Sequence, residues 1–350
     1  MRKRFLLLLL PSFFSLLFVA GCSPPPSDPG GATETAPAKQ KSTFALVVKS
    51  LENPYMSTMY DGFRGACDEL GAEALLLGPG ANGTPNQAQL IQNLIDQGVD
   101  AIAIAANDME ELSPALQRAK EAGIPVVSLD SVVKPNERIV HIQQASPEII
   151  GRVLIQACAQ MLDAEGEFAI LTTTDSMPNQ ASWVAWMHQE LLDHPEQYAN
   201  MRLVETAYGL DKAEPSAEAA RRLLAAYPQL KAIIAPTTVG LHATAAQIAR
   251  AGSPVKLTGL GLPSDMEAYI MNGICPWMYL WNPAEVGYLA AYAMDGFVEG
   301  TLKGELGEIV HAGSLGDKVV TRSEDGGFEI VLGYPKVFDM TNIAVWGELF

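Results

Sequence analysis

Polar side chains able to bind a small polar molecule come directly after short apolar segments of the sequence. They are Lys49, Asn107, Asp108, Asp130 and Asp175. An ionised carboxylate can accept hydrogen bonds from two hydroxyl groups at once, so aspartates at such positions suit a polyol. A neutral polyol also needs a dry crevice and aromatic faces against its C–H surfaces. These residue types indicate a hydrogen-bonding site.

Few motifs in the sequence are typical of an enzyme. The segment 78–83 matches the dinucleotide pattern G-x-G-x-x-G, but Pro79 removes a backbone N–H and the motif follows the second apolar segment, not the first. No phosphate-loop, zinc-protease or serine-hydrolase motif occurs, and the five histidines lack metal-ligand spacing. We therefore expect no catalytic residue, no metal and no cofactor.

Composition and charge narrow the class of protein. The chain has 350 residues, of which 48% are hydrophobic and 18% charged, a globular composition long enough for two domains. The formal net charge of −17 argues against binding to nucleic acid or anionic lipid. The cysteines form no CxxC pair. The four cysteines are Cys22, Cys67, Cys158 and Cys275. We expect the last three to be buried thiols, and a disulfide bond between Cys158 and Cys275 is left open.

The N-terminus has the pattern of a targeting segment. Three basic residues precede an apolar stretch at 5–20 that is shorter than a membrane span of about 20 residues. The stretch ends in Val-Ala-Gly-Cys, which resembles a bacterial lipobox and implies cleavage before Cys22 and acylation of its thiol. The alternative is an ordinary signal peptide with a chance cysteine. We expect a signal peptide at 1–21, a proline-rich tether at 22–42, and a lipid-anchored protein of the cell envelope, on its periplasmic or extracellular face.

From residue 43 onward, short apolar segments alternate with segments of helical periodicity. This alternation predicts βαβ units and an α/β fold with parallel sheets. A single sheet would be very long, so two doubly wound lobes are expected. The ends of their strands would face each other across a crevice.

The same region resembles the type I periplasmic substrate-binding proteins of sugar ABC importers, the ribose-binding-like class. The segments that carry the resemblance are 49–55 (KSLENPY), 98–102 (GVDAI), 106–108 (AND) and 123–127 (GIPVV). Four further segments resemble the rhamnose-binding and autoinducer-2-binding branch of this class: 235–240 (APTTVG), 259–263 (GLGLP), 280–283 (LWNP) and 337–343 (VFDMTNI).

The resemblance implies a set of ligand-binding residues. Pro236 and Thr238 would offer backbone groups, and Tyr55 and Trp281 would stack on the sugar. Asp108 could equally be a helix N-cap. The full expected set is Lys49, Asn53, Tyr55, Asn107, Asp108, Asp130, Asp175, Pro236, Thr238 and Trp281. Because Ser176 stands where the autoinducer-2 branch has glutamine, a deoxy or other monosaccharide is favoured over autoinducer-2.

The implied architecture has an N-terminal lobe of residues 43–145 and 282–312 and a C-terminal lobe of residues 146–281 and 313–350. Three crossings are expected near 144–148, 279–283 and 310–314. We predict a monomeric, non-enzymatic binding protein that closes over one sugar and docks on the permease subunits of an ABC importer. The alternatives are autoinducer-2 uptake, a sugar sensor that presents its closed form to a receptor kinase, and a DNA-binding regulator. The lipobox and the lack of an N-terminal helix-turn-helix oppose the last.

Overall fold

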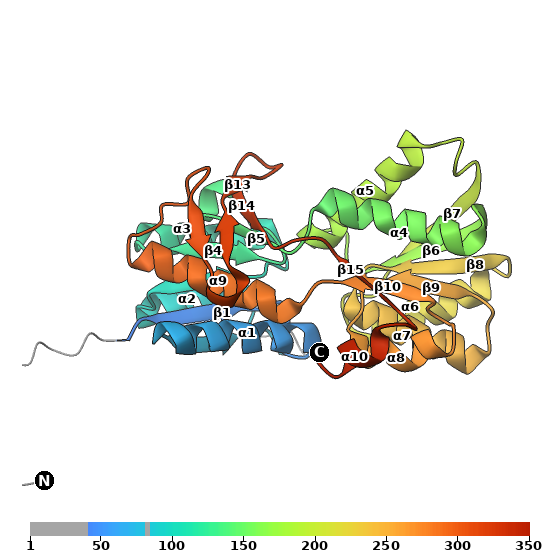
Figure 1. Cartoon of the computed structure of the whole chain (residues 1–350), viewed down its shortest axis with the longest axis horizontal. Helices are drawn as coiled ribbons and strands as arrows, with labels where there is room; N and C mark the ends of the chain where they lie inside the picture. Colours follow the sequence, from blue (N-terminus) through green and yellow to red (C-terminus); the bar gives the residue numbers. More distant parts are fainter. Residues whose placement is uncertain (1–40, 81–84) are drawn as a thin grey trace, which may run out of the picture. The chain divides into compact units, whose positions relative to one another are not determined.

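The computed structural model describes residues 41–80 and 85–350, and their strands form two parallel sheets with helices on both faces. This arrangement confirms the predicted α/β fold (Figure 1). The predictions for the signal peptide, for acylation of Cys22 and for most of the tether fall outside the described residues. None of the helices in the described part of the chain combines the length and apolar character of a membrane span.

The first lobe is built on a seven-stranded sheet. Its order is β13-β14-β5-β4-β3-β1-β2, and neighbouring strands are parallel except for β13 and β14. The strands are β1 (Thr43–Val47), β2 (Glu73–Leu77), β3 (Ala101–Ile104), β4 (Val126–Leu129), β5 (His141–Gln143), β13 (Thr321–Arg322) and β14 (Phe328–Val331).

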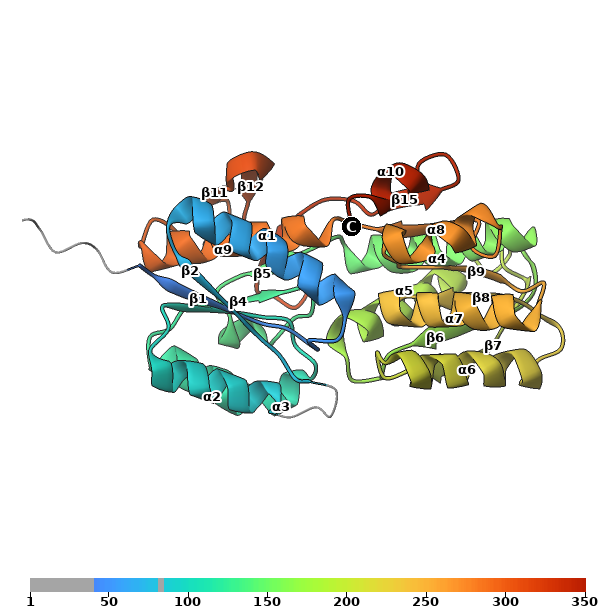
Figure 2. The same cartoon turned by 90° about the horizontal axis from the view of Figure 1, so that it is seen from below.

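Helices cover both faces of this sheet, which explains why its central strands are apolar throughout. Helices α1 (Pro54–Leu70) and α9 (Pro283–Val298) lie on one face, and α2 (Gln87–Gln97) and α3 (Met109–Glu121) lie on the other (Figure 2). Side chains alternate along a strand, so Phe44 and Leu46 join the core beneath α1, while Ala45 and Val47 join the core beneath α2.

Two glycines allow α1 and α9 to pack closely. A Cβ atom at Gly62 would overlap the backbone of Ala284, and one at Gly287 would overlap the backbone of Met59. The two helices come from distant parts of the sequence, and α9 belongs to the first lobe although it follows the second lobe in the chain.

The second lobe is built on a four-stranded parallel sheet of order β7-β6-β8-β9. Helices α4 and α5 pack together on one side of it, and α6 and α7 on the other (Figure 1). The elements are α4 (Pro147–Leu162), β6 (Glu165–Thr172), α5 (Pro178–Asp193), β7 (Asn200–Tyr208), α6 (Ala213–Ala226), β8 (Leu230–Ala235), α7 (Thr238–Ala251), β9 (Lys256–Gly259) and α8 (Pro263–Met271).

Short elements complete both lobes. An antiparallel pair, β10 and β15, lies beside β9, and α10 packs on α8. The hairpin of β11 and β12 follows α9. The bounds are β10 (Trp277–Leu280), β11 (Ile309–His311), β12 (Asp317–Val319), β15 (Lys336–Asp339) and α10 (Ile343–Gly347), with single 3₁₀ turns at Pro135–Glu137 and Gly313–Leu315.

The chain passes between the two sheets three times: between β5 and α4, between β10 and α9, and between β14 and β15. The third crossing is therefore at 332–335 and not at the predicted 310–314. Residues 313–331, assigned to the C-terminal lobe from the sequence, lie with the first lobe because β14 pairs with β5 in the first sheet. A four-residue strand leaves too short a pattern in the sequence to reveal which sheet it joins.

The three cysteines in the described residues, Cys67, Cys158 and Cys275, are buried and free. This confirms the prediction of buried thiols, and the bond between Cys158 and Cys275 that the sequence left open is not formed. Burial raises the pKa of the Cys158 thiol to about 12, so it stays protonated and unreactive at neutral pH.

Candidate functional site

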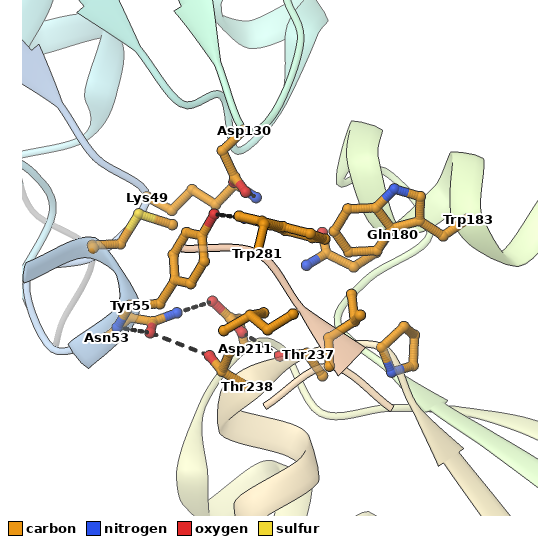
Figure 3. Close-up of a pocket in the computed structure, with 14 residues that line it drawn as sticks. Lys49, Asn53, Tyr55, Asp130, Gln180, Trp183, Asp211, Thr237, Thr238 and Trp281 are labelled. Atoms are coloured by element: carbon orange, nitrogen blue, oxygen red, sulfur yellow. Dashed lines mark hydrogen bonds and ion pairs between the residues drawn. The ribbon is translucent and has the colours of Figure 1, made fainter. Parts of the chain in front are cut away.

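Side chains from both lobes line a narrow cavity of about 30 Å³ (Figure 3). That is room for little more than one water molecule. The first lobe contributes the ends of β1 and β4 and the start of α1. The second contributes the start of α5, the loop after β7 and the segment between β8 and α7. The cavity therefore lies at the carboxyl ends of parallel strands, where doubly wound sheets bind ligands.

A buried ion pair forms one wall of the cavity. The Lys49 Nζ atom lies 2.7 Å from Asp130 Oδ2, and the two side chains are only 3% and 4% exposed. Lys49 follows β1 and Asp130 follows β4, and β3 lies between these two strands in the sheet. The long lysine side chain therefore spans the end of β3.

Asn179, at the start of α5, joins this pair from the other lobe. Its Oδ1 atom accepts a hydrogen bond from Lys49 Nζ at 3.0 Å, and its Nδ2 atom donates to Asp130 Oδ2 at 3.2 Å. One amide thus contacts both charges across the cleft. Asp130 itself has a left-handed backbone with φ of 60°, and its carbonyl oxygen accepts a hydrogen bond from Gln144 Nε2 at 3.1 Å. Such a conformation in a residue other than glycine typically costs about 1–2 kcal/mol and is common at functional sites.

A second polar network crosses the cleft on the opposite wall. Asn53 caps α1 through a hydrogen bond from the Tyr55 N–H, and its Nδ2 donates to Asp211 Oδ2 at 3.1 Å. The Thr237 hydroxyl donates to Asp211 Oδ1 at 2.8 Å, and the Thr238 hydroxyl donates to Asn53 Oδ1 at 3.5 Å. Asp211 also has a left-handed backbone, with φ of 52°. Both carboxylates of the cavity thus stand on bent loops at strand ends.

Three aromatic rings pack beside the polar groups. The Trp281 indole N–H donates to the Tyr55 hydroxyl at 2.7 Å, and these rings meet edge to face at 6.4 Å. Trp183 meets Trp281 at 6.0 Å. Burial raises the pKa of Tyr55 well above its usual value, and the charge of Asp130 adds to this effect, so the hydroxyl stays neutral. The rings offer apolar faces for the C–H surfaces of a ligand.

Gln180 supplies a polar atom that the protein itself leaves unused. The side chain is 6% exposed, and its Oε1 atom has no hydrogen-bond partner among the described residues. Gln180 lines the cavity beside Trp281 and Trp183 (Figure 3). A buried carbonyl oxygen without a partner costs about 1–3 kcal/mol, so a hydroxyl group of a ligand would relieve this cost.

The structure brings most of the sequence-predicted residues together. Seven of the ten expected positions line the cavity: Lys49, Asn53, Tyr55, Asp130, Pro236, Thr238 and Trp281. The other three do not. Asp175 is exposed on the loop before α5, five residues ahead of Gln180, which does line the cavity. Asn107 donates its amide to the Lys49 carbonyl at 3.0 Å and so supports the Lys49 backbone. Asp108 accepts hydrogen bonds from the N–H groups of Glu110 and Glu111 and caps α3.

Sequence reasoning missed Asn179, which contacts the Lys49–Asp130 pair. It also missed four polar or aromatic residues that line the cavity: Gln180, Trp183, Asp211 and Thr237. Asn179 and Gln180 carried a usable signal, since they follow Pro178, a residue type that favours the first position of a helix, and the structure places both in the first turn of α5. Trp183 is buried in the core and also lines the cavity. Asp211 lies three residues after a strand, in a loop whose direction the sequence does not reveal.

Known proteins share sequence similarity with this chain. The profile of the family described as periplasmic binding protein domain matches residues 44–302. The curated D-ribose/D-allose-binding protein of Pseudomonas aeruginosa is 29% identical over 255 residues, which cover 68% of this chain and 76% of that protein.

Two solved structures have the same fold. An ABC transporter solute binding protein from Clostridium phytofermentas with bound L-rhamnose is 38% identical, with a TM-score of 0.85 over 89% of this chain and 99% of its own. LsrB from Clostridium saccharobutylicum in complex with AI-2 has a TM-score of 0.81 over 87% of this chain and 99% of its own. The latter is 20% identical, so its likeness supports the fold alone.

Proposed function

The chain belongs to the periplasmic binding protein domain family, and from this premise we propose that it binds one monosaccharide in the cavity between its lobes. The observation that carries the proposal is the lining of the cavity. Two carboxylates, an ammonium group and two amides from both lobes converge beside three aromatic rings. Polar groups of this kind match the hydroxyls of a sugar, and the rings match its C–H faces.

Each side of the cavity has its own role in this proposal. Asp130 and Asp211 accept hydrogen bonds from sugar hydroxyls, while Lys49 and Asn53 donate to sugar oxygens. Gln180 accepts one further hydroxyl. The start of α7 lacks a side-chain cap at Thr237, so its first backbone N–H groups can donate to a sugar oxygen.

A deoxy sugar such as L-rhamnose is the favoured ligand. The 38% identical solute binding protein holds L-rhamnose, and the cavity here has apolar groups that could accept a methyl group, namely Met56, Leu260 and Leu280 beside the rings. We propose that the loaded protein delivers this sugar to the permease subunits of an ABC importer. It would act as a monomer without catalysis, held to the membrane by an acylated Cys22 at the face where the importer opens.

Calorimetric titration of the purified protein tests the ligand class. We expect L-rhamnose or a related monosaccharide to bind, and D-ribose, D-allose and autoinducer-2 serve as comparison ligands. A ligand at 100-fold its Kd would add about 2.7 kcal/mol to the free energy of unfolding, a clear rise in melting temperature. Binding of an amino acid or a metal ion with no response to any sugar would overturn the proposal.

Membrane fractionation tests the anchor. Cys22→Ser removes the thiol that would be acylated, so the variant should appear in the soluble fraction of the envelope and should incorporate no labelled palmitate. Cys67→Ser, a buried thiol, is the matched control and should fractionate like the wild type. A Cys22→Ser variant that remains with the membrane and takes up palmitate would contradict the assignment.

A further inference from the structure

A second cavity, of about 170 Å³, lies beside the first. The two cavities share Asp130 and Trp183, and the second too is lined from both lobes. The first lobe contributes β5, the turn between β13 and β14, and β14 itself. The second contributes the starts of α4 and α5. The sugar site proposed above makes no use of this space.

The charged groups around the second cavity are mostly acidic. Arg138 compensates Asp325, to which its Nη2 atom donates at 2.8 Å. His141 is buried, and burial together with the charge of Arg138 lowers its pKa to about 3, so it is neutral at physiological pH. Lys49 compensates Asp130 from the side of the first cavity. Two carboxylates, Glu324 and Glu329, remain without a compensating charge.

Glu329 is the more enclosed of these two. It is half-buried on β14 opposite His141, and its carboxylate makes no hydrogen bond or ion pair with the described residues. Burial and the charges of Glu324 and Asp325 raise its pKa to about 7, while Arg138 acts in the opposite direction. A carboxylate in this position lacks a cation.

A buried hydrogen-bond donor on the opposite wall also lacks a partner. The Trp183 side chain is 2% exposed, and its Nε1–H finds no acceptor among the described residues. The nitrogen lies on the ring edge away from Thr237 and Asp211 (Figure 3). Trp183 lines both cavities. An indole N–H of this kind requires an oxygen acceptor.

We propose that the second cavity binds a small amino alcohol. Its protonated amine would lie beside Glu329 and Glu324, and its hydroxyl oxygen would accept the Trp183 N–H. No group of three or more metal-ligating side chains forms in the described residues, which favours an organic cation over a metal ion. Such a ligand contacts both lobes and is therefore a bridge between them.

The protonation state of Glu329 gives this site a characteristic pH dependence. The amine stays charged below about pH 9, whereas Glu329 ionises near neutrality. Hydrogen bonds from Ser323 and Arg138 outweigh the effect of burial and lower the pKa of Asp325, and burial keeps His141 neutral in this range. Glu324 and Arg138 line the same cavity. Amine binding should therefore strengthen as the pH rises through about 7.

Calorimetric titration with ethanolamine, in the absence of sugar, tests the proposal. We expect binding at about pH 8 that weakens by about tenfold at pH 5.5, no binding of uncharged ethylene glycol, and weaker binding of ethylamine, which has no hydroxyl. Glu329→Gln should weaken ethanolamine binding by about tenfold or more, and Trp183→Phe should abolish the preference over ethylamine. Glu196→Gln, an exposed carboxylate of the second lobe, is the matched control.

The melting temperature of each variant separates lost binding from lost folding, and Glu324→Gln gives a second test if Glu329→Gln does not fold. Equal heats for ethanolamine and ethylene glycol, or unchanged ethanolamine affinity in folded Glu329→Gln, would overturn the proposal. A sugar titration of Glu329→Gln is independent of these outcomes, because Glu329 does not line the first cavity. Failure of the sugar proposal would leave the amine result standing.

Discussion

Replacing Asp130 should affect folding and ligand binding together, because its partner Lys49 is almost completely buried. In Asp130→Asn the Lys49 ammonium would keep only Asn179 and the new amide as neighbours. Removing one charge of a buried pair typically destabilises a protein by about 3–5 kcal/mol. At roughly 2 °C per kcal/mol for a chain of this size, the melting temperature should fall by about 6–10 °C.

The same substitution should weaken sugar binding. Hydrogen bonds to charged groups contribute about 1.5–3 kcal/mol, so the loss of the Asp130 carboxylate corresponds to about 10- to 100-fold in Kd. Calorimetry with L-rhamnose measures this directly, at a temperature where the variant is folded. An unchanged affinity would remove Asp130 from the ligand site.

A double variant separates the two effects. Lys49→Met with Asp130→Asn leaves no buried charge at this position, so most of the lost stability should return, whereas sugar affinity should stay low. The four proteins of this cycle can be compared by urea denaturation. If the two single losses simply add in the double variant, the charges do not interact and the reasoning from the ion pair fails.

Three further predictions concern other parts of the molecule. Gln180→Leu removes a buried oxygen without a hydrogen-bond partner, so the melting temperature should stay equal or rise. The same variant should bind sugar about tenfold more weakly, and an unchanged Kd would exclude Gln180 from the site. Gly62→Ala should destabilise the protein by about 1–3 kcal/mol, because the added methyl group would overlap α9. Gly65→Ala is the control on the open face of α1 and should stabilise the protein by up to about 1 kcal/mol. Equal melting temperatures of the two variants would refute the close packing of α1 and α9. Because the pKa of Glu329 is raised to about 7 from 4.5, the folded state holds a proton that the unfolded chain has lost, and stability from this group falls as the pH rises between these values. Glu329→Gln should therefore raise the melting temperature at about pH 8 and leave it nearly unchanged at about pH 4, and the same shift at both would contradict this.

The alternation of apolar and helical segments was sufficient to predict the α/β fold, since most strands of the two large sheets have their own apolar run. The three-residue strand β5 and the four-residue strands β10 and β14 were missed or left unassigned, because such short patterns do not distinguish a strand from a loop. The third crossing was misplaced for the same reason.

The residues of the candidate site also fall into those that the sequence could predict and those that it could not. Lys49 and Asp130 could be predicted because strand ends of one lobe face one edge of its sheet. Asp211 could not be placed, because its position depends on left-handed loop backbone. The contacts of Asp211 and Asn179 with the other lobe could not be predicted, because they depend on how one lobe meets the other. Sequence periodicity carries no information about contacts between lobes, and these contacts complete both polar networks of the cavity.

These networks also bear on how tightly a ligand can be held. Asn179 contacts Lys49 and Asp130 across the cleft, and Asn53 contacts Asp211, so polar groups that would bind a sugar already have partners in the other lobe. A sugar that takes over these hydrogen bonds gains only the difference between its contacts and those it replaces. The groups that gain most are those without a partner, Gln180 Oε1 in the first cavity and Trp183 Nε1 at its border with the second. Selectivity among sugars should therefore depend more on the hydroxyl that reaches Gln180 than on those that meet the ion pair, because only the former satisfies a group that the protein leaves unpaired.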